Sequence, residues 1–134
     1  DYAFVKEILK NTATPYEKEY KISEVIKSKD YFSIVDAYFQ KVKILDFKSF
    51  DSFFSEEISD STIIKLQDAF VGASKEMGKF DKLLVTGLHY DSLADTKEPV
   101  IVIYADFSNA NAFVKSKFII ILETKKIIHF GINE

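Results

Sequence analysis

The chain has 134 residues, 47% of them hydrophobic and 15% aromatic, which suits a single domain with a substantial core. Its 18 basic residues, all lysine, stand against 21 acidic ones, giving a formal net charge of −3. Arginine is the two-pronged donor for phosphates and guanine edges, so its absence from an acidic chain argues against a nucleic-acid partner. The lack of cysteine excludes disulfide scaffolds and thiolate metal sites, and we expect no metal and no cofactor.

Two features bear on location. The longest apolar runs, 100–105 and 118–122, are far shorter than the roughly 18 residues of a membrane span. The sequence begins at Asp1 and not at methionine, which fits a removed leader or lipoprotein signal. We therefore expect an extracytoplasmic protein, periplasmic or at the cell surface, with the cytoplasm as the alternative.

The first half of the chain has helical patterns. Residues 1–30 predict an N-terminal extension with one helix over Tyr16–Ser28, followed by one domain over residues 31–134. After residue 30, apolar residues recur at steps of three and four, which predicts a helix with one buried stripe. The stripe consists of Tyr31, Val35, Tyr38, Phe39, Val42 and Leu45.

Two further patterns predict helical segments in the first half of the chain. Four phenylalanines between residues 47 and 54 alternate with small polar residues and predict a helical turn that bridges two longer helices. The next apolar stripe, from Ile63 to Met77, follows candidate N-cap oxygens on Asp60, Ser61 and Thr62. Gly78 then stands where a helix commonly ends.

After Gly78 the period of the pattern changes to two, which predicts strands at 79–91, 100–107, 112–123 and 127–132. In the first strand, Leu84 and Leu88 share one parity, Val85 and His89 the other, and Gly87 is a candidate for a bulge. Asparagines at 109 and 111 predict a hairpin connection because asparagine tolerates left-handed geometry. The fold class is therefore α+β, with N-terminal helices on one face of a curled four-stranded antiparallel sheet.

The order of elements resembles the nuclear-transport-factor-type, cystatin-like cone fold. The stretch 31–132 is similar to small bacterial domains of that superfamily, which often follow a lipoprotein signal. The resemblance is carried by Phe50–Ser55, Lys75–Phe80, Ala105–Asn109 and Ile128–Ile132. It implies a pocket-bearing fold whose members include isomerases, dehydratases and non-catalytic binding or assembly domains, so it implies no single activity.

Four residues are candidates for acid-base chemistry. His89 and His129 are the only imidazoles, and they could move a proton if both faced the interior of the cone. Asp106 ends an apolar strand on the parity of Tyr104, so a desolvated carboxylate could work beside a phenol donor. The alternatives are ordinary sheet histidines and an aspartate that caps the following turn.

Aromatic residues give the other candidate site. Tyr38, Phe39, Phe54 and Phe70 could line a cavity for a small apolar ligand, although phenylalanine at helical spacing is usually plain core. We expect a non-catalytic module that binds such a ligand or a protein partner. An isomerase- or dehydratase-like enzyme and an assembly domain of a cell-envelope or secretion complex are the alternatives, with a homodimer through the sheet face as one form of partner.

Overall fold

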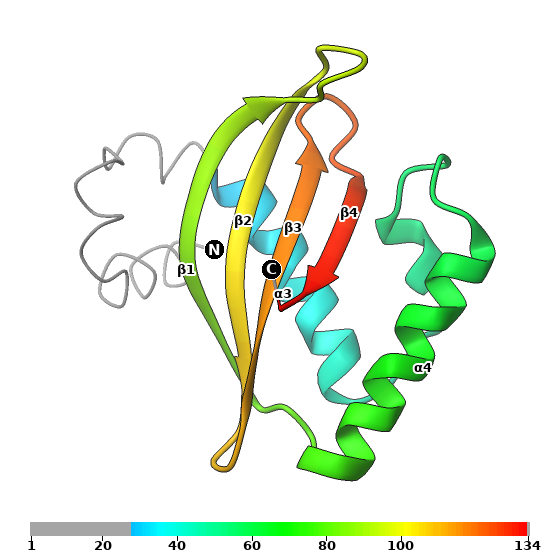
Figure 1. Ribbon diagram of the computed structural model, residues 1–134, viewed down its shortest axis with the longest axis vertical. Helices are drawn as coiled ribbons and strands as arrows, with labels where there is room; N and C mark the ends of the chain where they lie inside the picture. Colours follow the sequence, from blue (N-terminus) through cyan, green and yellow to red (C-terminus); the bar gives the residue numbers. More distant parts are fainter. Residues whose placement is uncertain (1–27, 134) are drawn as a thin grey trace.

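The structure, a computed structural model, describes residues 28–133, so the helix expected at Tyr16–Ser28, apart from Ser28 itself, and most of the expected extension 1–30 lie outside the described residues. Two helices pack with a four-stranded antiparallel sheet that curls without closing, which confirms the α+β class. Figure 1 shows α3 crossing behind the sheet and α4 standing beside β4. One apolar core joins both helices to the same side of the sheet.

Helix α3, Lys29–Lys43, has most of the expected stripe, but Phe32 is buried at its start where Tyr31 was expected, and Tyr31 is only partly buried. Its buried residues, spaced at three and four, are Phe32, Val35, Tyr38, Phe39 and Val42. Tyr38 is 0% and Phe39 2% exposed, which confirms that the middle of the helix packs inward. Leu45 lies beyond the helix, at a positive φ of 54°.

The bridging turn is the short helix η1, Phe50–Phe53, and the next helix is α4, Asp60–Met77. The expected N-cap of α4 was wrong by one residue, because Ser59 accepts the hydrogen bond from the Thr62 backbone amide. At the other end Gly78 has a φ of +83°, a conformation that costs a side chain-bearing residue free energy. The Asn109 side-chain amide donates to the Met77 carbonyl there, at 2.9 Å, and ties the helix end to the sheet.

The four strands form a meander in chain order. They are β1 Lys82–Ser92, β2 Pro99–Ser108, β3 Phe113–Ile121 and β4 Ile127–Ile132. The register of β1 against β2 shifts between Val85 and Gly87, which confirms the bulge. The extra residue, Thr86, reverses the parity beyond it. Val85 and Leu88 therefore share the core face, and the expected assignment of Leu84 and Leu88 to one face was wrong.

The hairpin between β2 and β3 forms as expected, but for another physical reason. The Asn109 side-chain oxygen accepts hydrogen bonds from the backbone amides of Asn111 and Ala112, at 2.8 and 2.9 Å. The residues with positive φ among 28–133 do not include either asparagine. Left-handed geometry was therefore the wrong explanation, and the side-chain amide shapes the turn.

Candidate functional site

All four acid-base candidates lie on the face of the sheet opposite the helices, which we call the outer face. In the register, Val102 stands between His89 and Ile119, and Ile119 is in turn opposite His129. Tyr104 and Asp106 continue the same side of β2 toward its end. This face has a small apolar cluster of its own, in which Val100, Val102 and Ile121 pack against Leu93, Tyr104, Ile119 and Ile128.

The histidines do not converge. Because His89 is on β1 and His129 on β4, three strand spacings separate them, which is about 14 Å. The His89 and Tyr104 rings are neighbours, with centroids 5.8 Å apart. The structure therefore brings His89 next to Tyr104 and leaves His129 on the same face but three strands away.

Asp106 lies two residues beyond Tyr104 on β2, roughly 7 Å along the strand, and it is paired with Lys115 on β3. Desolvation by burial raises the pKa of the Asp106 carboxyl, and the positive charge of Lys115 acts in the opposite direction. The bonds that hold the following turn come from Asn109, so capping by Asp106 does not account for this turn. The catalytic role of these four residues remains a prediction.

The ligand-binding candidates lie on the other side, in a cluster of aromatic rings between the sheet, the helices and η1. Tyr38 is at its centre. Its ring centroid is 4.8 to 6.1 Å from those of six phenylalanines, namely Phe50, Phe53, Phe54, Phe70, Phe118 and Phe130. We call these seven rings the Tyr38 cluster. Phe39 lies next to it and contacts Phe107, at 5.1 Å.

Sequence reasoning missed the sheet's share of this cluster. Phe118 on β3 and Phe130 on β4 contact Tyr38 at 5.0 and 4.9 Å and each other at 4.8 Å. They lie opposite one another in the register, so they share a face. Strand parity with the buried Ile120 was the signal that could have placed Phe118 there.

The Tyr38 hydroxyl is the most unusual polar group of the site. Among the described residues it is the one buried side-chain oxygen or nitrogen without a hydrogen-bond partner. Such a group loses its hydration and gains nothing in return, at a cost of about 1–3 kcal/mol. The same desolvation raises the pKa of this phenol well above 10.0, so it stays protonated near neutral pH and can donate a hydrogen bond.

One wall of the cluster is an irregular stretch, residues 46–59, which we call the covering segment. It supplies Phe50 and Phe54, which are buried, and Phe53, which is half-buried and contacts Tyr38 at 5.5 Å. The cluster thus reaches the surface at the covering segment. Elsewhere its rings are held by α3, α4, β3 and β4.

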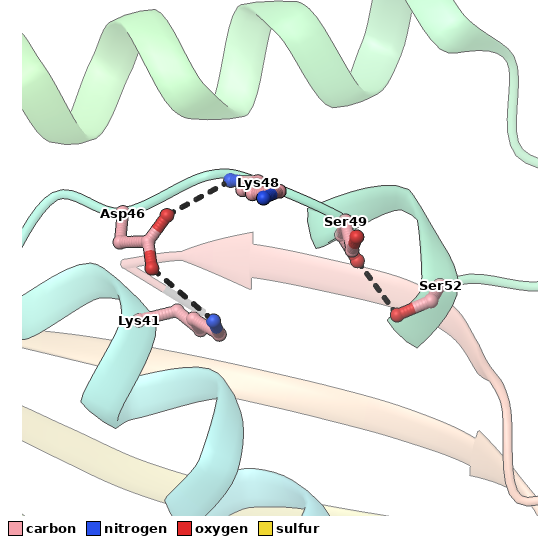
Figure 2. Close-up of polar contacts among 5 residues, drawn as sticks. All are labelled: Lys41, Asp46, Lys48, Ser49 and Ser52. Carbon is pink, nitrogen blue, oxygen red and sulfur yellow. Dashed lines mark hydrogen bonds and ion pairs between the residues drawn. The ribbon is translucent and has the colours of Figure 1, made fainter.

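Figure 2 shows polar contacts at the start of the covering segment and around η1. At its start, Asp46 accepts hydrogen bonds from the Lys48 backbone amide, at 3.1 Å, and from Lys41 of α3, at 3.3 Å. These two bonds, the backbone one first, lower the pKa of the Asp46 carboxyl. Farther along, Ser52 donates to the Ser49 carbonyl at 2.6 Å. The segment is therefore fixed mainly by its own turns.

The covering segment also makes few polar contacts with the sheet. The Ser55 amide donates to the Ile127 carbonyl at 2.8 Å, and Phe54 forms a single bridge with Ile127. Lys126 reaches the Ser52 carbonyl at 2.7 Å with its ammonium group. Among the described residues, the backbone contacts of the covering segment with the sheet are confined to Ile127, while the buried rings of Phe50 and Phe54 hold the segment in the core.

The described residues offer neither a metal site nor a membrane span. No group of three or more His, Cys, Asp or Glu side chains is placed to hold a metal ion within residues 28–133. In that same part of the chain, no helix is long and apolar enough to cross a membrane.

Comparison with known proteins adds no relative. No protein-family model, no curated protein and no solved structure matches this chain. Membership of the cone superfamily therefore stays a prediction from the sequence.

Proposed function

We propose that the chain is a binding module that holds a small apolar ligand in the Tyr38 cluster. The observation that carries the proposal is the cluster itself, in which contacting aromatic rings extend from the centre of the core to the half-buried Phe53. Sites for small molecules are lined mainly by apolar and aromatic side chains with a few polar groups that fix orientation. The Tyr38 hydroxyl is a polar group of that kind.

The arrangement of the acid-base candidates supports binding over catalysis. Acid-base chemistry needs several groups within about 3 Å of one reacting atom. His89 and His129 are separated by two intervening strands, and Asp106 is displaced from Tyr104 along β2. A protein partner or a second copy on the outer face remains the alternative, and the apolar cluster around Val102 is what favours it.

Entry of a ligand requires movement of the covering segment. The rings of the Tyr38 cluster are in contact with one another, so an incoming molecule must displace some of them. Phe53 is the most exposed ring of the cluster, because it is half-buried while the other six rings are buried. We propose that outward rotation of the Phe53 side chain admits the ligand.

The test is a titration with cumene, a neutral apolar probe, followed by side-chain NMR. We expect resonance shifts at Phe118 and Phe130, inside the cluster, and none at the Val102 methyl groups of the outer face. Shifts confined to Val102 would instead support the partner surface. The absence of shifts with both cumene and its ketone counterpart acetophenone, up to the solubility of each, would refute the proposal.

Two phenylalanine variants locate the entry route. Phe53→Ala removes the half-buried ring beside Tyr38, so cumene should exchange faster with the cluster. Phe113→Ala is the matched control, because Phe113 is 60% exposed and belongs to the outer face. Equal exchange rates in both variants would contradict entry through the covering segment.

A further inference from the structure

The unpartnered Tyr38 hydroxyl specifies the ligand further, on the assumption that the proposed function is right. A phenol has one donor hydrogen, and here no atom of residues 28–133 accepts it. The surrounding rings offer only weak contacts with their π-faces, which are second-order in strength. A bound molecule with an acceptor atom at this point would therefore gain a hydrogen bond that the empty protein does not make.

The surroundings also limit what else the ligand can carry. Among residues 28–133 the buried polar or charged residues, apart from tyrosines, are Ser28 and Ser116. The Ser116 hydroxyl donates to the Ala105 carbonyl at 2.8 Å, and Ser28 is paired with the Tyr90 hydroxyl. No buried charged side chain in this part of the chain could compensate a charged ligand, and burying an uncompensated charge is very costly.

We propose that the Tyr38 cluster selects a neutral, mostly apolar molecule with a single hydrogen-bond acceptor, such as a ketone or an ether, and that the Tyr38 hydroxyl donates to that acceptor. The raised pKa of Tyr38 fits this role, because a phenol that stays protonated is a donor at every physiological pH. A ligand that carries only donors would leave the hydroxyl as it is in the empty protein.

Acetophenone and cumene form a matched pair of probes, because a carbonyl oxygen in one replaces a methyl group in the other. Both dissociation constants are measured for the wild-type chain and for Tyr38→Phe, and the four values form a cycle that cancels the different hydration of the probes. Acetophenone should bind about ten-fold more weakly to Tyr38→Phe, which corresponds to about 1.4 kcal/mol. Cumene should bind both proteins equally or prefer Tyr38→Phe.

Tyr31→Phe is the control variant, because the Tyr31 hydroxyl already donates to the Leu122 carbonyl at 2.8 Å and lies outside the cluster. It should leave the affinity for acetophenone unchanged. If both probes bind the cluster and Tyr38→Phe weakens neither relative to the other, the choice of ligand class is refuted while the proposed function stands. If neither probe shifts the Phe118 and Phe130 resonances, both proposals fail.

Discussion

Removal of the Tyr38 hydroxyl should stabilise the protein. Most tyrosine-to-phenylalanine changes in a core cost stability because they break a hydrogen bond. Tyr38 is 0% exposed and its hydroxyl has no partner, so Tyr38→Phe removes a desolvated polar atom without breaking a bond. The six ring contacts of the side chain remain, because phenylalanine keeps the ring.

The magnitude follows from two terms of opposite sign. An unsatisfied buried hydroxyl costs about 1–3 kcal/mol, and that cost disappears. The departing oxygen leaves a void smaller than a methyl group, which costs less than about 1 kcal/mol. We therefore expect a gain of about 1–2 kcal/mol in the free energy of unfolding, or roughly 3–8 °C in Tm for a chain of this size.

The measurement is urea denaturation at pH 7, with Tyr31→Phe beside it. The Tyr31 hydroxyl donates to the Leu122 carbonyl, so its removal should destabilise the protein by about 0.5–1.5 kcal/mol. The two variants make the same chemical change, and only the bonding of the hydroxyl differs. A Tyr38→Phe protein that is less stable than wild type would refute the reasoning, because it would show that the hydroxyl has a partner such as a buried water.

Four other predictions concern separate parts of the molecule. Because the pKa of Tyr38 is raised above 10.0, this phenol ionises in the unfolded chain before it ionises in the folded protein, so it should lower the free energy of unfolding by up to about 1.4 kcal/mol per pH unit above pH 10. Denaturation between about pH 9 and about pH 11 should therefore show a smaller loss of stability in Tyr38→Phe than in the wild type. Phe39→Ala, at a residue 2% exposed, should cost about 3–5 kcal/mol in the same assay, and a cost below about 1 kcal/mol would contradict the packing of α3. Gly72→Ala should raise stability by about 0.5–1 kcal/mol, because Gly72 lies inside α4 and an added methyl group would meet nothing within 4 Å. Lys115→Ala should raise the NMR-measured pKa of Asp106 further, since the Lys115 charge now lowers it, and an unchanged pKa would show that the two groups do not interact.

The helices and strands could be predicted because their patterns are local. Side chains of α3 repeat every three to four residues, and β4 was expected and found at Ile127–Ile132. Local patterns failed at the bulge, where one extra residue changes the face of the sheet to which every later residue of the strand belongs. Thr86 in the bulge reverses which residues of β1 face the core beyond it. The reversal puts Leu88 on the core face and His89 on the outer face.

The site was only half predictable. Tyr38 was recognised as part of an apolar stripe, and the middle of that stripe is buried as expected. A periodic pattern treats tyrosine as one more apolar residue and says nothing about its hydroxyl. Whether that oxygen finds a partner depends on rings from η1, β3, β4 and α4, which come together only in the fold.

The contrast between the two sides of the sheet gives the binding proposal its physical basis. On the outer face, polar groups lie beside one another, as Asp106 and Lys115 do in the register of β2 and β3 and as His89 and the Tyr104 ring do. On the helix side the Ser116 hydroxyl is bonded, and the Tyr38 hydroxyl alone is left without an acceptor among the described residues. A phenylalanine at position 38 would fill the same space without that cost. A buried donor that weakens the empty protein by about 1–3 kcal/mol is explained when an acceptor arrives from outside, and the same free energy then favours the bound state.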